Sequence, residues 1–159
     1  NLFYLNDGRG RFARLDEPVR ALVSSLEISR AIASGDIDGD GDIDLLVANL
    51  HDRVRLYRND APRQGHWLAV RALDPVLKRD AVGAQVTLVM GDLHAMRTIA
   101  TSFGYLAGHS PWLHFGTGDV ETVDRIEVRW ADGSKELFPG VATDRAITLL
   151  KGSGEADDG

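Results

Sequence analysis

The sequence contains no cysteine, and this absence excludes two classes of chemistry. Without thiols there is no disulfide framework and no cysteine nucleophile, although the compartment stays open because many exported bacterial proteins also lack cysteine. The GxSxG elbow, the HExxH zinc motif and a phosphate-cradling glycine loop are missing as well. These motifs would indicate a serine hydrolase, a zinc protease or a nucleotide-binding protein. We therefore expect no catalytic residues and no enzymatic activity in this chain.

Long apolar runs and excess positive charge are also lacking. No stretch reaches the length that a membrane-spanning helix needs. The net charge of −6 argues against a nucleic acid or a membrane surface as partner. The 159 residues are enough to bury a core in one or two domains. The chain begins at Asn1 without a start methionine or a signal-peptide pattern, so we expect a piece of a longer protein.

The densest feature of the sequence is a run of five aspartates on alternate positions: Asp36, Asp38, Asp40, Asp42 and Asp44. The first three occupy positions 1, 3 and 5 of a calcium loop, and Gly41 occupies position 6, where the chain must turn sharply. Asp42 can offer its carbonyl, and Asp44 a carboxylate. Hard oxygen ligands without cysteine or histidine favour Ca²⁺. The alternative is an acidic turn that is screened only by water.

The segments on both sides of this loop predict strands. Residues 30–34 and 45–50 are short apolar runs bounded by turn residues. An EF-hand would need an acidic residue at position 12 followed by a helix, but Val47 stands there. A calcium loop that joins two strands and closes on Asp44 resembles the FG-GAP or VCBS repeat of integrin-type β-propellers.

A second copy of part of this pattern lies at the start of the chain. Tyr4, Asn6 and Asp7 recur at one constant spacing as Tyr57, Asn59 and Asp60, which is typical of a repeat array. Residues 1–14 predict a hairpin. We expect residues 1–62 to hold the end of one FG-GAP-type repeat and most of the next, a partial propeller blade. Residues 15–27 form a linker, in which residues 21–23 fit a short helix or a strand.

Beyond residues 61–65 the composition changes, and we predict a second domain over residues 63–151. Apolar and polar residues alternate in strands predicted at 67–73, 84–90, 94–100, 125–130, 135–138 and 146–150. In the fourth of these, Ile126, Val128 and Trp130 point inward. Many short antiparallel strands favour a β-sandwich or a small barrel, so the fold class is all-β. The polar segment 152–159 predicts a disordered tail.

Several ordered motifs of this second half are similar to the ASPIC/UnbV domain. They are HWLAVRAL, RDAVGAQVTLV, GYLAGHSPWLHFGTGD and VDRIEVRWADGS, followed by AITLL. The resemblance covers residues 65–150. Such domains typically follow FG-GAP repeats in exported bacterial proteins and in cartilage acidic protein. The resemblance implies an extracellular, cell-surface or periplasmic protein.

Candidate ligand contacts outside the acidic run lie in a glycine-bounded loop. Tyr105 and Trp112 could stack on a sugar or an aromatic side chain, and His109 could donate hydrogen bonds. Alternatively, Tyr105, Leu113 and Phe115 pack in the core while His114 satisfies backbone groups. His51 fits a turn between two strands, or a metal ligand.

Together these features predict a calcium-binding, non-enzymatic binding or adhesion module. Its partners would be a protein or carbohydrate ligand and the upstream propeller blades, with self-association possible through exposed blade edges. The alternative is an accessory domain of a biosynthetic or hydrolytic enzyme whose catalytic part lies upstream.

Overall fold

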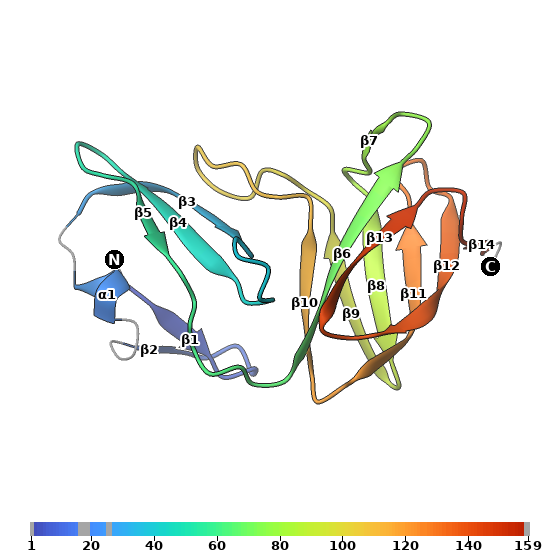
Figure 1. Cartoon of the computed structure of the whole chain (residues 1–159), viewed down its shortest axis with the longest axis horizontal. Helices are drawn as coiled ribbons and strands as arrows, with labels where there is room; N and C mark the ends of the chain where they lie inside the picture. Colours follow the sequence, from blue (N-terminus) through green and yellow to red (C-terminus); the bar gives the residue numbers. More distant parts are fainter. Residues whose placement is uncertain (1, 16–19, 25–26, 158–159) are drawn as a thin grey trace.

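The structure is a computed structural model that describes residues 2–15, 20–24 and 27–157. Apart from the four-residue helix α1 (Arg20–Val23), every regular element that it describes is a strand. Figure 1 shows two parts, an N-terminal group of strands and a C-terminal pair of facing sheets. The predicted all-β fold class is therefore confirmed. The helix also decides between the alternatives for residues 21–23.

The N-terminal hairpin consists of β1 (Tyr4–Asn6) and β2 (Phe12–Arg14), which pair antiparallel as the turn residues between them predicted. The repeated asparagines adopt the same local hydrogen bond. Asn6 Oδ1 accepts from the backbone N–H of Gly8 at 2.9 Å, and Asn59 Oδ1 accepts from that of Ala61 at 3.2 Å. Such Asx turns end a strand by satisfying the next free amide. The residues that recur in the sequence thus form the same local structure at Asn6 and Asn59.

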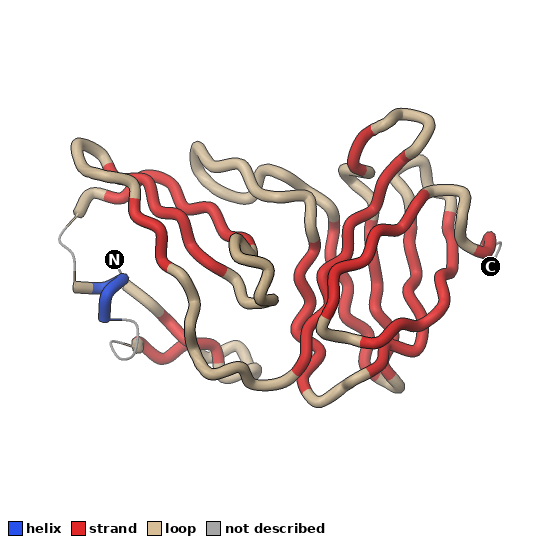
Figure 2. Tube along the Cα trace, viewed as in Figure 1, coloured by secondary structure: helices blue, strands red, loops and turns tan. Residues whose placement is uncertain are grey.

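A three-stranded antiparallel sheet follows, in the order β3 (Ser29–Gly35), β4 (Asp44–Asn49) and β5 (Arg55–Tyr57). The acidic loop, residues 36–44, joins β3 to β4 at one end of this sheet, as Figure 2 shows. A propeller blade has four strands, so the sheet resembles one blade with a strand missing. We call it the blade sheet.

Two facing sheets form the C-terminal domain. One consists of β10 (Leu113–Gly118), β6 (His66–Asp74) and β13 (Arg145–Leu150), with the short β7 (Arg79–Asp80) beside β6. The other runs β14 (Glu155–Ala156), β12 (Lys135–Ala142), β11 (Thr122–Arg129), β8 (Gln85–Met90) and β9 (Leu93–Thr98). No sheet of the described residues closes on itself, so the fold is the predicted sandwich rather than the barrel.

The core lies between these two sheets. Alternate side chains of each strand point inward, which is the period-two pattern of a half-buried strand. Leu68, Val70 and Ala72 of β6 are fully buried, and they face a set from the other sheet that includes Val86, Leu88, Ile126 and Val128. Trp130 is 2% exposed and points inward as predicted. Burial of this continuous apolar face stabilises the domain.

Three features of the sandwich differ from the predictions. The pair β6–β13 is parallel, although an antiparallel sandwich was expected; the strands lie far apart in sequence, and a parallel pair requires such a long connection. Strand β10 was expected to be part of a loop. Residues 152–157, expected to be disordered, are held instead: both carboxylate oxygens of Glu136 accept backbone N–H groups, from Gly152 and Gly154 at 2.8 Å each, and β14 pairs with β12.

Candidate metal centre

The acidic loop is shaped by hydrogen bonds from its own backbone to its first carboxylate. Asp36 Oδ1 accepts from the N–H of Gly39 at 2.7 Å, and Asp36 Oδ2 accepts from that of Gly41 at 3.0 Å. Both glycines have positive φ, +79° and +93°, a region that residues with a Cβ enter at a cost. The loop therefore curls around Asp36.

This curl brings three of the five predicted ligands together. One carboxylate oxygen from each of Asp36, Asp38 and Asp40 lies within 4.8 Å of the others. Three negative charges at this separation repel one another unless a cation lies among them. Carboxylate oxygens on a flexible loop match the ligands that Ca²⁺ takes at 2.3–2.6 Å. The donor set therefore fits calcium.

The other two predicted ligands have different surroundings. Asp44 is 1% exposed, and its two carboxylate oxygens accept the backbone N–H groups of Ile37, at 2.9 Å, and Asn59, at 2.8 Å. It therefore closes the loop and ties β5 to it. The Asp42 carboxylate lies 3.9 Å from the guanidinium of Arg63, and its backbone N–H donates to Asp40. Neither side chain joins the three-carboxylate group. Metal ligation by any of the five aspartates stays a prediction.

The acidic loop also forms the contact with the sandwich. His114 of β10 donates from Nε2 to the Gly41 carbonyl at 2.7 Å, and its ring stacks on Trp67 of β6 with centroids 5.9 Å apart. A Cβ on Gly41 would lie 2.1 Å from Cε2 of Trp67. The Trp67 indole thus occupies the space that a side chain at position 41 would need. Arg63, in the segment between β5 and β6, donates to the backbone carbonyl of Asp40.

These docking residues were not predicted as a group. Gly41 was assigned to the turn alone, and His114 only to unspecified backbone groups. The sequence does contain His114 in a predicted loop and Trp67 at the start of a predicted strand. However, neither signal indicates which distant residue it contacts.

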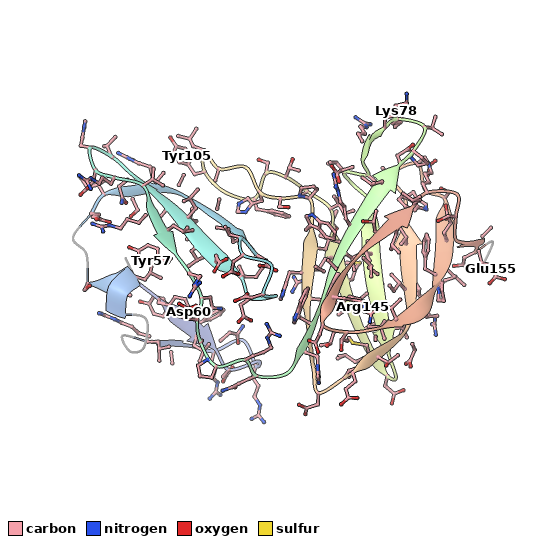
Figure 3. The ribbon with its side chains drawn as sticks, viewed as in Figure 1. Tyr57, Asp60, Lys78, Tyr105, Arg145 and Glu155 are labelled. Atoms are coloured by element: carbon pink, nitrogen blue, oxygen red, sulfur yellow. The ribbon has the colours of Figure 1, made fainter. Side chains whose placement is uncertain are left out.

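The glycine-bounded ligand loop was predicted over residues 104–116, but β10 begins at Leu113, and the loop in the structure spans residues 99–112. Leu113 and Phe115, which follow it, are buried, but Tyr105 is 71% exposed at the outer end of the loop (Figure 3), so the expectation that it packs in the core is wrong. Trp112 is 38% exposed. His109 Nδ1 lies 3.5 Å from the backbone N–H of Ser34, so this histidine connects the loop to β3. His51 lies in the exposed turn between β4 and β5, as the assignment to a turn predicted.

A charged pair lies beside the junction of the two parts. His66 Nδ1 is 2.6 Å from Asp144 Oδ2, and the backbone N–H of Trp67 donates to the other oxygen at 3.3 Å. The hydrogen bond to Asp144 raises the pKa of His66 above 6.5, and the same bond lowers the pKa of Asp144 below 3.8. The pair connects the start of β6 to the turn before β13.

Comparison with known proteins matches two family models to overlapping parts of the chain. Residues 76–156, about half of it, match the ASPIC and UnbV family. The chain belongs to the ASPIC/UnbV family. Residues 36–93 match the FG-GAP-like repeat, a match that starts at the first aspartate of the acidic loop and runs into the sandwich. Both resemblances stated from sequence motifs are thereby confirmed.

Two curated relatives are cartilage acidic protein 1 of Mus musculus and of Homo sapiens. Each is 31% identical over 122 residues, which cover 73% of this chain and 18% of the relative. The chain thus spans about a fifth of the length of these relatives. The two domains and the relatives suggest a domain of a larger extracellular protein. Within the described residues, no helix has the length and apolar character needed to cross a membrane.

Proposed function

We propose that this part of the protein is a calcium-binding, non-enzymatic binding module of an extracellular protein. The observation that carries the proposal is the convergence of Asp36, Asp38 and Asp40 within 4.8 Å on a loop that also contacts the sandwich. A calcium ion there would neutralise the three carboxylates. It would thereby stiffen the element that joins the blade sheet to the second domain.

The chain's own residues prepare this loop for the ion. Asp36 holds the turn through the amides of Gly39 and Gly41, and buried Asp44 anchors its far end. The side chains of Asp38 and Asp40 are exposed and can move toward a cation without breaking the core. Weak calcium loops, with Kd on the order of 10⁻⁴–10⁻³ M, are filled outside cells. This range suits an extracellular module.

A calcium titration tests the proposal. Binding to the folded form alone stabilises it by about 2.7 kcal/mol at a hundredfold excess over Kd. For a chain of this size that raises the Tm by about 5–10 °C. The double variant Asp36→Asn/Asp38→Asn should lose this rise. The control Asp92→Asn/Asp119→Asn removes the same charge from exposed turns and should keep it. An equal Tm in calcium and in chelator would refute calcium binding.

The non-enzymatic part of the proposal has its own test. The carboxylates of Asp36, Asp40 and Asp44 accept backbone amides, and no assembled nucleophile–base pair supports catalysis in the described residues. A panel of glycoside, ester and peptide substrates should give no turnover. Turnover that persists through repurification and disappears on substitution of a chain residue would overturn this part. It would favour the alternative of an enzyme's accessory domain.

The apolar side chains of the N-terminal strands suggest where neighbouring blades attach. Leu46 of β4 pairs across the blade sheet with Leu56 of β5, and both are exposed, at 42% and 55%. Exposed pairs of this kind mark interaction surfaces. We propose that upstream blades cover them in the longer protein, and that copies of the isolated chain associate through them. In sedimentation, Leu46→Lys/Leu56→Lys should abolish association; a strictly monomeric parent chain at high concentration would refute it.

A further inference from the structure

A cleft of about 900 Å³ opens between the blade sheet and the sandwich. The acidic loop and the end of β3 form one wall, and residues of β6, β9, β10 and the 99–112 loop form the other. Pockets of about 300–1,000 Å³ are the usual size for small ligands. The chemistry of this cleft therefore indicates what it would bind.

Hydrogen-bond donors without acceptors line the cleft. His109 faces the backbone N–H of Ser34 with Nδ1, so Nδ1 is the acceptor and the neutral ring carries its proton on Nε2. That Nε2 is buried and has no partner among the described residues, and the same holds for Nε1 of Trp67. Buried donors without partners are rare in folded proteins and costly. Both side chains line the cleft, but Nε1 of Trp67 lies against Gly41 of the acidic loop. A ligand with an acceptor oxygen would therefore satisfy His109.

Two arginines of the cleft have no acidic partner among the described residues. Arg97 and Arg145 line it, and neither forms a salt bridge within the part of the chain that the structure describes. The two acidic residues of the lining are already committed. Asp36 accepts two amides of its own loop, and Asp144 is paired with His66. The uncompensated guanidinium groups favour an anionic ligand, because arginine binds carboxylate and other oxyanions with paired N–H groups.

An aromatic surface completes the lining. Trp112 is 38% exposed, and its ring is steadied by the Arg71 guanidinium at 6.0 Å from the ring centroid. Arg71 is itself held by Asp80 through two hydrogen bonds, of 2.6 and 3.1 Å. An indole fixed in this way offers a preorganised apolar contact beside polar groups. Trp112 thus provides a flat contact at a small entropic cost.

We propose that this cleft binds a short anionic saccharide, a sugar carrying carboxylate or sulfate groups. The proposal rests on the proposed function of the chain as a binding module, and names its ligand class and site. A sugar oxygen would accept from His109, the anionic group would pair with Arg97 and Arg145, and a ring face would lie on Trp112. A cleft of about 900 Å³ suits a short oligosaccharide rather than an extended acidic peptide, which needs a groove or a free strand edge.

Calorimetric titration of the calcium-saturated chain tests the site. The probes are uronate, sulfated and neutral oligosaccharides of equal length, and an acidic peptide of equal charge. Uronate or sulfated sugar should bind, the neutral sugar should bind at least about tenfold more weakly, and added salt should reduce the difference. The variants Arg97→Gln/Arg145→Gln and Trp112→Ala should each lower affinity about tenfold or more at unchanged Tm. Arg9→Gln/Arg79→Gln, in exposed positions outside the cleft, should bind as the parent does.

Four outcomes would overturn the proposal: equal binding of neutral sugar, binding of the peptide alone, affinity that Arg97→Gln/Arg145→Gln leaves unchanged, or no binding of any saccharide. If the saccharides fail while calcium still raises the Tm, the cleft proposal falls and the calcium proposal stands. If calcium fails while sugar binding follows the cleft variants, the reverse holds.

Discussion

His114 and Gly41 are seventy-three residues apart, yet the imidazole Nε2 of one donates a 2.7 Å hydrogen bond to the backbone carbonyl of the other. The bond joins β10 of the sandwich to the middle of the acidic loop. A change in the shape of that loop therefore reaches the second domain directly. This geometry predicts coupling between the proposed cation site and the junction of the two parts.

Calcium removal should loosen the junction and leave the sandwich core intact. Without the ion, repulsion among Asp36, Asp38 and Asp40 should open the acidic loop and weaken its contact with His114. Hydrogen exchange should rise at residues 36–44 and at the amide of Trp67 when chelator is added. Amides of β8 and β11 should keep their protection. A uniform rise across both parts, or none, would contradict this coupling.

Alanine substitutions at two glycines of the acidic loop distinguish the cost of a strained backbone from the cost of disturbing the contact with Trp67. Gly39 and Gly41 both have positive φ, but a Cβ meets nothing within 4 Å at Gly39 and overlaps Trp67 at Gly41. Gly39→Ala should lower the free energy of unfolding by about 1 kcal/mol, the cost of the left-handed backbone. Gly41→Ala should lower it by about 2–4 kcal/mol, since overpacking adds to that cost. Denaturant unfolding measures both; equal losses would show that the Trp67 contact is unimportant.

The His66–Asp144 pair should make stability depend on pH. Because its folded pKa is raised above 6.5, charged His66 contributes stability that is fully present below 6.5 and is lost as pH rises through the folded value. Asp144, whose pKa is lowered, stays ionised down to below 3.8. As the pH rises from 6.5 through the folded pKa of His66, the Tm should therefore fall.

Asp144→Asn provides the matched test of that pH dependence. The amide cannot pair with the imidazolium, so the fall in Tm that is due to His66 should disappear. Asp92→Asn removes an acid from an exposed turn and should leave the fall unchanged. A parent-like pH profile in Asp144→Asn would show that another group is responsible.

Loss of the Glu136 carboxylate should release the C-terminal segment. It accepts the amides of Gly152 and Gly154 while only 8% exposed. Glu136→Ala would leave two backbone donors without a partner, at a cost of about 1–3 kcal/mol. Limited proteolysis should then cut at residues 152–157. Glu155→Ala, which removes an exposed acid from the same segment, should remain resistant; similar cleavage of both variants would count against the prediction.

Local patterns were sufficient for most strands and for the position of the acidic loop. The alternation in residues 67–73 and 125–130 predicted strands that the structure contains, because one face of each strand packs in the core. The segment 152–157 was missed for the opposite reason. Its polar composition has no apolar period, and it is held by a carboxylate on β12.

The amino-acid sequence by itself determined the all-β class, the two-part organisation and the convergence of three aspartates, since each depends on residues close together in the chain. Tertiary structure alone decided that the Asp44 carboxylate accepts backbone amides and that Gly41 packs against Trp67. It also decided that His109, Arg97 and Arg145 line one cleft. These are contacts between distant segments. Their partners are chosen by how the sheets pack, and no local period encodes that choice.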